Sequence, residues 1–459
     1  MKSILSIVLV LSLSLSAKAQ IDSDPKELSL EDYLGWVDQY HPLLKAVGNK
    51  LPIAKAERLK ARGAFDPTFI GNYASKEFKG DLYYRLPNWS VETATRGPLS
   101  LSLDWNQTAG LYTNPQNNLP DEGLFALGGM VQLGNGLITD QRRTDLALAK
   151  AAVALTEAEA ELYRNELLFK ASKAYWKWYS TVEALAAYEK AITAAREVYD
   201  FTMRSFEAGD ASAMDTLDAS GLLTTWQTDY FNARKDAIEA LFEASNWLWN
   251  EEGKPVVLNE KIQPVANDGF QVNFGSLNEE HPFVRYNTQK EKQFRLKRTL
   301  AREYLKPKVA VGGAVLVAGN TENIPSLEVI NTNDRVLKAK VEMPLFLREG
   351  IGYSRSAQLH LENFQWERAA KENAWQNDIN ATAKAIVALE QGLVVSTRNQ
   401  RAMEDLLEAE KKKLEFGDSE LIKVNLRTSY YLKSVVQRAK MQAELGIKKA
   451  SMRELTASF

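Results

Sequence analysis

Two aspartates, Asp215 and Asp218, have the type and spacing that could do chemistry in this chain of 459 residues. Residues three apart lie on one face of a helix, so the two carboxylates would form a single acidic patch. Such patches favour cations where several of them surround a narrow passage. The same spacing is also typical of a solvated helix face, and the sequence leaves both interpretations open.

Few residues in this sequence could act in catalysis or bind a metal or cofactor. The chain has no cysteine, which excludes disulfides, thiol nucleophiles and zinc–thiolate sites. Two of its three histidines, His41 and His281, each precede a proline, and packing or capping explains them better than metal binding. Gly134 and Gly136 lack the third glycine of a dinucleotide-binding turn. We therefore expect no enzyme activity, no cofactor and no metal site.

The N-terminal segment and the net charge indicate an exported protein that does not bind nucleic acid. Lys2, the apolar stretch from Ile4 to Leu15 and the sequence Ala17-Lys18-Ala19 match a signal peptide over residues 1–19. The apolar stretch is shorter than the roughly 20 residues that a membrane-spanning helix needs. The 57 basic and 59 acidic residues give a formal charge of −2, whereas nucleic-acid-binding surfaces are normally strongly basic.

Four sequence matches in the same order indicate that one unit is written twice. His41-Pro42 recurs as His281-Pro282 and Pro67 as Pro307, both at an offset of 240 residues. Val131–Leu133 resembles Val341–Met343 at an offset of 210, and Phe206–Asp210 resembles Leu414–Asp418 at an offset of 208. We predict two copies, residues 20–252 and 276–459, joined by a linker at 253–275.

The first copy has a longer segment between Pro67 and Val131 than the second copy has between Pro307 and Val341. The extra residues could form an extracellular loop, an additional hairpin or a cap.

Each copy is expected to contain a long helix, a glycine turn and a shorter returning helix. From after Gly136 to about Phe206, a heptad pattern typical of coiled coils would give a helix of about 105 Å; its apolar positions are Leu148, Leu155, Leu162, Phe169 and Trp176. Gly209 and Gly417 should end the long helices, and shorter helices should follow over 212–250 and 420–455. An opening helix over 29–63 contains Pro42 and Pro52, so we expect it to be kinked or broken.

Strand-like alternation lies between the helices. In Leu99–Trp105 leucine and tryptophan alternate with serine and aspartate, and similar patterns cover 125–133, 309–317 and 337–343. This pattern predicts four principal transmembrane strands per chain, although a soluble sheet with one wet face has the same period. Aromatic residues gather around the strands as in an interfacial girdle: Phe69, Tyr73, Tyr83, Tyr84, Trp89, Trp105 and Tyr112. Four strands cannot close a barrel, so several chains would have to share one.

The segments Arg204–Ser212 and Met214–Ala219, the sequence Met343-Pro344-Leu345-Phe346 and the two-copy organisation carry a family resemblance. With these features the mature chain resembles the TolC family of outer-membrane efflux proteins over nearly its whole length. The resemblance implies a homotrimer with a twelve-stranded transmembrane β-barrel, continued by a long α-helical coiled-coil barrel in the periplasm. It also implies a passive exit duct of a tripartite efflux or type I secretion system, docked to a periplasmic adaptor (membrane fusion protein) and an inner-membrane pump.

The resemblance also assigns roles to the two helix–turn–helix tips. Adaptor docking is expected at six residues: Gly209, Asp210, Ser212, Gly417, Asp418 and Ser419. Selectivity or gating of the entrance is expected at Asp215 and Asp218, whose counterparts in the second copy are Lys423 and Leu426. Simple helix capping by glycine, serine and aspartate is an alternative role for the tips, and both roles can hold together.

A soluble periplasmic coiled-coil adaptor or scaffold is the alternative from another functional class. Adaptors carry one helical hairpin flanked by lipoyl-type β-domains, whereas this sequence predicts two hairpins joined to strand pairs. The exit duct is therefore the function that the sequence favours.

Overall fold

The computed structural model describes residues 27–113, 119–266, 277–318 and 333–459. The predicted signal peptide and part of the predicted linker lie outside these residues. The elements, in chain order, are β1 (Glu27–Leu28), α1 (Leu30–Tyr40), α2 (Pro42–Gly63), β2 (Thr68–Phe78), β3 (Asp81–Ala94), β4 (Leu99–Asn106), β5 (Leu124–Gln132), α3 (Gln141–Glu207), α4 (Ala213–Ser245), β6 (Gln263–Pro264), α5 (Pro282–Glu303), β7 (Lys308–Ala318), β8 (Arg335–Glu342), α6 (Arg348–Glu415) and α7 (Leu421–Leu455). Among the described helices, none is both long and apolar enough to cross a bilayer.

The opening helix is broken at the first proline, as predicted. The Ser29 side chain caps α1 by accepting a hydrogen bond from the Asp32 backbone N–H. His41 is extended, because a residue that precedes proline avoids the helical conformation, and Pro42 then begins α2. Pro52 lies inside α2.

The chain divides into two compact units, and each draws residues from both predicted copies. We call the described residues 27–41, 170–266 and 387–448 the helical unit. The sheet unit comprises the described residues of 42–169 and 277–386, together with 449–459. The division into two repeated copies therefore remains a prediction.

The core of the helical unit is built on aromatic side chains of α3. Tyr175, Trp176 and Trp178 are fully buried. The Tyr175 hydroxyl oxygen lies 2.8 Å from the Leu28 carbonyl oxygen and accepts a hydrogen bond of 3.0 Å from the Val265 backbone N–H, so it joins the ends of the short parallel β1–β6 pair to α3. Gly446 of α7 lies directly against the Trp176 ring, where no β-carbon would fit.

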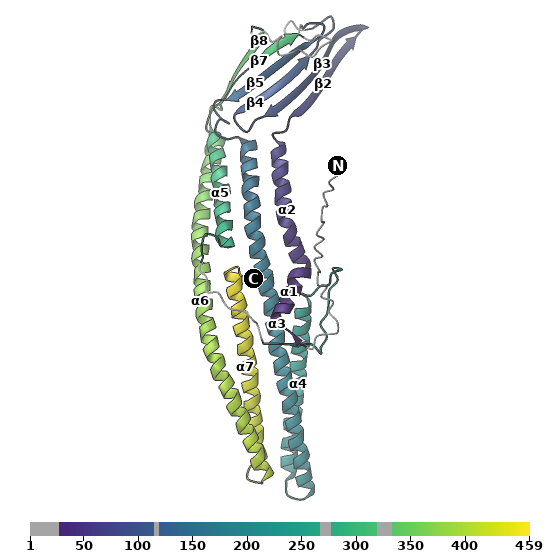
Figure 1. Ribbon diagram of the computed structural model, residues 1–459, viewed down its shortest axis with the longest axis vertical. Helices are drawn as coiled ribbons and strands as arrows, with labels where there is room; N and C mark the ends of the chain where they lie inside the picture. Colours follow the sequence, from purple (N-terminus) through teal and green to yellow (C-terminus); the bar gives the residue numbers. More distant parts are fainter. Residues whose placement is uncertain (1–26, 114–118, 267–276, 319–332) are drawn as a thin grey trace, which may run out of the picture. The chain divides into compact units, whose positions relative to one another are not determined.

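The sheet unit contains one antiparallel sheet of six strands in the order β2-β3-β4-β5-β7-β8 (Figure 1). The prediction of four strands is therefore wrong for this sheet. The four predicted strands correspond to β4, β5, β7 and β8, and the extra segment after Pro67 forms an additional hairpin, β2–β3. The alternation of this hairpin is obscured in the sequence because β3 contains Pro87 and a bulge at Lys76/Glu77 shifts the register.

The strand register aligns the apolar residues of all six strands on one face. Trp89 of β3 pairs with Trp105 of β4, which pairs with Phe125 of β5, which in turn pairs with Val317 of β7. In this register Leu337 of the edge strand β8 lies on the same face as Val317. The added hairpin therefore continues the apolar face of the predicted strands.

The opposite face of the sheet carries polar side chains on β2, β3, β4 and β8. A ladder of amides crosses three strands: the Asn72 amide donates to Asn88 at 3.2 Å, and the Asn88 amide donates to Asn106 at 2.5 Å. Ser102 and Asp104 lie on this face of β4 and form a hydrogen bond of 3.1 Å. The alternation that predicted transmembrane strands is thus clear on β3, β4 and β8, whereas β5 and β7 carry mainly alanine and glycine on this face.

The heptad seam of the long helix faces inward. Its small and polar companion positions are all buried: Thr144, Ala151, Ala158, Asn165 and Ser172. The apolar positions are buried or half-buried along the same side of α3. Small residues at the companion positions allow neighbouring helices to approach closely.

Candidate functional site

The turn between α3 and α4 closes the long helix through its backbone. The Gly209 N–H donates to the Phe206 carbonyl at 3.0 Å, and the Asp210 N–H donates to the Ser205 carbonyl at 2.8 Å. This pair of bonds is a Schellman motif, and it needs a left-handed residue after the last helical turn. Gly209 supplies that conformation with φ +85° and has open space around it. We call this turn the first tip.

The turn between α6 and α7, the second tip, ends its long helix in the same way. The Gly417 N–H donates to the Leu414 carbonyl at 3.0 Å, and the Asp418 N–H donates to the Lys413 carbonyl at 2.9 Å. Gly417 has φ +79°. The predicted glycine turns are thus present at both tips, and conformation rather than side-chain contact explains the glycines.

The first tip starts its returning helix with a capping box. The Ser212 hydroxyl oxygen accepts a hydrogen bond of 3.2 Å from the Asp215 N–H, and the Asp215 carboxylate accepts one of 2.8 Å from the Ser212 N–H. The same carboxylate oxygen accepts the Ser212 hydroxyl at 2.7 Å. Two backbone donors that a helix start would leave unpaired are therefore satisfied by side chains.

The second tip starts its returning helix differently. At the positions equivalent to Ser212 and Asp215 it carries Glu420 and Lys423, whose charged groups lie 3.8 Å apart. The Ser419 hydroxyl donates instead to the Glu410 carboxylate of α6 at 2.5 Å. The Arg427 side chain of α7 lies 3.5 Å from the same carboxylate. The hydrogen bond from Ser419, together with Arg427, keeps the pKa of Glu410 below its usual range.

The two aspartates singled out from the sequence occupy different environments. Both are exposed on the first turns of α4. Asp215 is held by Ser212, whereas Asp218 forms no hydrogen bond or ion pair with any residue that the structure describes. Only Asp218 therefore presents an uncommitted carboxylate beside the first tip.

Packing behind the tips brings together helices from both predicted copies. Val198 of α3, Leu407 of α6 and Val424 of α7 form a buried cluster. The Lys411 ammonium lies 3.8 Å from the Glu197 carboxylate, so an ion pair also joins α6 to α3. Both tips thus belong to one packed group of helices.

The sequence analysis missed a set of apolar side chains around the tips. Met214 and Leu217 are 67% and 68% exposed at the first tip, and Phe416 and Ile422 are 81% and 70% exposed at the second. Exposed apolar side chains that cluster in this way mark interaction surfaces. Their position beside the tip glycines is the signal in the sequence that marks them, because residues next to a tight surface turn are seldom buried.

The histidines have structural roles. His41 stacks on Trp247 with ring centroids 5.2 Å apart. The His281 side chain caps α5 by accepting a hydrogen bond from the Phe283 N–H. The interpretation of packing and capping is therefore confirmed. In the described part of the chain, no group of three or more His, Cys, Asp or Glu side chains is arranged to hold a metal ion.

The capping box should make the first turn of α4 sensitive to acid. The pKa of Asp215 lies below its ordinary value of 3.8, because the Ser212 N–H and then its hydroxyl bond the charged carboxylate. Such a group stabilises the folded turn fully above its ordinary pKa, and its contribution is lost as the pH falls through the lower folded value. We expect amide-exchange protection of residues 212–216, corrected for intrinsic rates, to fall in that acid range.

Two variants separate the capping box from general acid effects. Asp215→Ala should show reduced protection already at neutral pH and no further loss in acid. Asp218→Ala, a change of the same charge one turn away, should keep the protection and the acid dependence of the original chain. An unchanged acid response in Asp215→Ala would show that the box does not stabilise the turn.

Comparison with solved structures shows the fold of outer-membrane channels. The CmeC channel of Campylobacter jejuni matches with a TM-score of 0.67 and 12% identity, covering 93% of this chain and 85% of that one. The outer membrane protein VceC of Vibrio cholerae matches with a TM-score of 0.65 and 11% identity, covering 93% and 96%. The MtrE channel of Neisseria gonorrhoeae matches with a TM-score of 0.64 and 13% identity, covering 93% and 88%.

Comparison by sequence gives a family match for part of the chain and no curated relative. No curated protein matches the chain. Residues 99–243, from β4 through α3 and the first tip to α4, match the family described as outer membrane efflux protein. The family match over residues 99–243 and the fold of outer-membrane channels confirm the resemblance to the TolC family that the sequence predicted.

Proposed function

We propose that this chain is the outer-membrane channel of a tripartite efflux or type I secretion system. In this role it is a passive exit duct, docked to a periplasmic adaptor and supplied by an inner-membrane pump. The observation that carries the proposal is the six-stranded sheet, whose register gathers large apolar residues on one face and places polar residues of β3, β4 and β8 on the other. A sheet with these two faces can separate lipid from a water-filled lumen. The alternative, a soluble adaptor or scaffold, has no comparable support, because the matching family is that of outer membrane efflux proteins.

The two edges of the sheet support a shared barrel. Among the described residues, β2 and β8 each pair with a neighbour on one side only. Open backbone edges are not tolerated in hydrocarbon, because unpaired N–H and C=O groups find no water there. We infer that β2 of one copy pairs with β8 of the next. Three copies, as the family implies, would then form a barrel of eighteen strands rather than twelve, six from each chain.

Cysteine cross-linking tests this closure, since the chain has no cysteine of its own. Asn72→Cys on β2, combined with Lys338→Cys on β8, should give covalent trimers on denaturing gels after mild oxidation. Both positions lie on the polar face of the sheet. A single chain does not define the register in which β2 of one copy pairs with β8 of the next. Cysteine pairs at neighbouring positions on the same two strands are therefore tested as well.

The matched control is Ser102→Cys on β4, combined with Lys338→Cys. Strands β5 and β7 separate these positions within one chain, so no link is expected. If the hairpin β2–β3 stood outside the barrel, β4 would become the pairing edge. Cross-links in the control pair and their absence in the test pair would then refute the eighteen-stranded barrel.

We propose that Asp215 and Asp218 form a cation-favouring ring at the periplasmic entrance. Three copies would place six carboxylates there. The second tip has no equivalent pair, since Lys423 and Leu426 occupy those positions. In planar bilayers the original chain should conduct with a preference for K⁺ over Cl⁻. Asp215→Asn with Asp218→Asn should move the permeability ratio towards one. Asp229→Asn with Glu239→Gln removes the same charge farther along α4 and should leave the ratio unchanged; an equal effect in both variants would argue against the ring.

We propose that the two tips dock the adaptor. The residues assigned from the family resemblance lie on both turns: Gly209, Asp210, Ser212, Gly417, Asp418 and Ser419. The exposed side chains of Leu217, Phe416 and Ile422 add apolar contact area beside these turns. Exposed aromatic and aliphatic side chains of this kind are the anchors that dominate protein interfaces.

Phe416→Ser with Ile422→Ser should weaken docking, by about 2 kcal/mol or roughly thirty-fold in affinity for each anchor that is central to the interface. The measurement is the amount of membrane fusion protein that co-purifies with the tagged channel from its own cells. Val395→Ser changes an exposed side chain of α6 away from the tip and should have no effect. Undiminished co-purification of the double variant would place the docking surface elsewhere.

A further inference from the structure

Two cavities in the sheet unit are lined by basic side chains. The first arginine cavity has a volume of about 460 Å³ and is lined by six residues that matter here: Arg58, Arg62, Phe65, Arg96, Arg143 and Lys150. The second arginine cavity has a volume of about 410 Å³, and its lining includes Arg298, Arg302, Leu305 and Arg355. Neither cavity touches the tips proposed above as the functional site.

The two cavities occupy corresponding places in the predicted copies. Arg58 and Arg298, Arg62 and Arg302, and Phe65 and Leu305 are each separated by 240 residues. This is the offset at which His41-Pro42 recurs. In both cases two arginines one turn apart, at the end of the helix that precedes a strand, form one wall together with an apolar residue.

Both cavities lie where helices meet the sheet. In the first, α2 ends one residue after Arg62 and β2 begins at Thr68, while Arg96 lies in the turn between β3 and β4. In the second, α5 ends one residue after Arg302 and β7 begins at Lys308. In an outer-membrane protein whose helices extend into the periplasm, this junction lies at the level of the periplasmic lipid headgroups.

Neither cavity has an acidic side chain in its lining. Within the described ranges, Arg58, Arg62, Arg96 and Lys150 have no ion pair or side-chain hydrogen bond. In the second cavity the Arg298 Nε–H is buried and has no hydrogen-bond partner in the described structure. Several cations in so small a space repel one another, so an anion would be stabilised there.

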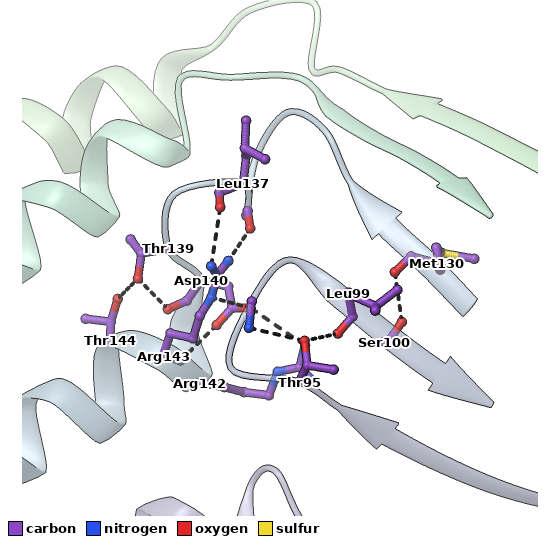
Figure 2. A network of polar contacts seen from close by, with 12 residues as sticks. Thr95, Leu99, Ser100, Met130, Leu137, Thr139, Asp140, Arg142, Arg143 and Thr144 are labelled. Atoms are coloured by element: carbon purple, nitrogen blue, oxygen red, sulfur yellow. Dashed lines mark hydrogen bonds and ion pairs between the residues drawn. The ribbon is translucent and has the colours of Figure 1, made fainter. Parts of the chain in front are cut away.

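Arg143, which lines the first cavity, is fixed in place by several contacts. Its guanidinium donates to the Leu137 carbonyl at 3.3 Å and to the Gly136 carbonyl, and its Nε lies 3.3 Å from the Asp140 carboxylate (Figure 2). The Asp140 carboxylate also lies 3.7 Å from Arg142. It is thus shared between two arginines and does not neutralise the remaining cations of the cavity.

A second acidic side chain at this junction is also engaged. Glu303 is buried, accepts a hydrogen bond of 3.2 Å from the Gly136 N–H and pairs with Lys306 at 2.5 Å. Its charge holds the loop after β5 to the end of α5. The cavity linings themselves contain basic but no acidic side chains, beside a junction that these bonds hold together.

We propose that each arginine cavity binds the phosphate group of an anionic phospholipid from the periplasmic leaflet. Guanidinium groups match phosphate oxygens in paired hydrogen bonds, and basic pockets at a membrane surface bind such headgroups. The apolar walls formed by Phe65 and by Leu305 with Ile351 fit the glycerol and the first methylenes of a lipid better than a free ion. The assignment rests on the outer-membrane placement of the proposed function.

The test is lipid binding to the full chain in neutral detergent, followed by mass spectrometry of the intact assembly. Phosphatidylglycerol should bind to the original chain. Arg58→Gln with Arg62→Gln, and separately Arg298→Gln with Arg302→Gln, should each weaken its own class of sites. The affinity for phosphatidylglycerol should fall about five-fold for each charge removed, and therefore roughly twenty-five-fold for each pair of substitutions. Lys55→Gln with Lys60→Gln is the matched control on α2, with the same charge change outside the cavity lining, and should bind as the original chain does.

Two further probes distinguish the source of the phosphate. Phosphatidylcholine should bind far more weakly than phosphatidylglycerol. Inorganic phosphate should not compete at millimolar concentration. If inorganic phosphate competes as well as the lipid, the cavities are free-anion sites and the lipid assignment is overturned. Equal losses in the lysine control, or equal binding of phosphatidylcholine, would indicate nonspecific adsorption and would overturn it as well.

Conductance separates this proposal from the proposed function. The arginine variants should still form channels in bilayers of neutral lipid, which also verifies that they fold. A conducting channel that binds no anionic lipid refutes the lipid sites alone. Lipid binding by a chain that never conducts would refute the channel instead.

Discussion

The satisfaction of backbone hydrogen bonds at the sheet edges is the constraint on which the rest of the structure depends. Within lipid an unpaired N–H or C=O group costs several kcal/mol, and β2 and β8 each leave one edge open in the described chain. The continuous register from Trp89 to Val317 places apolar side chains of neighbouring strands on one face. If the edges pair with those of other copies, as proposed, membrane insertion and assembly are one process.

The two tips reverse very long helices, and they do so with different contacts. Both end in the same Schellman geometry, but Ser212 and Asp215 cap one returning helix locally, whereas Ser419 binds Glu410 on the preceding helix. The second tip is therefore tied across its turn by side chains, and the first is closed within its own first turn. A channel that opens at this end would have to release different contacts at alternate hairpins.

The junction between helices and sheet combines rigidity with unbalanced charge. Arg143 and Glu303 fasten the loop after β5 through backbone groups, while the other arginines of the cavities stay without partners among the described residues. Unpaired cations cost stability in an isolated chain and become favourable once an anionic surface is present. Their placement at the ends of strands fits a structure that is completed by its membrane as well as by its copies.

The sequence by itself determined the helices, the glycine turns, the break at Pro42 and four of the strands, because these features depend on local periodicity and on residues with special conformations. It also supplied the family resemblance through the residues of the first tip. Only the tertiary structure decided that the segment after Pro67 forms the β2–β3 hairpin, because Pro87 and a bulge obscure its alternation and only pairing with β4 reveals its apolar face. The exposed apolar side chains of the tips and the gathering of Arg58, Arg96 and Arg143 in one cavity also emerged only from the folded chain, since exposure and proximity depend on contacts between residues far apart in sequence.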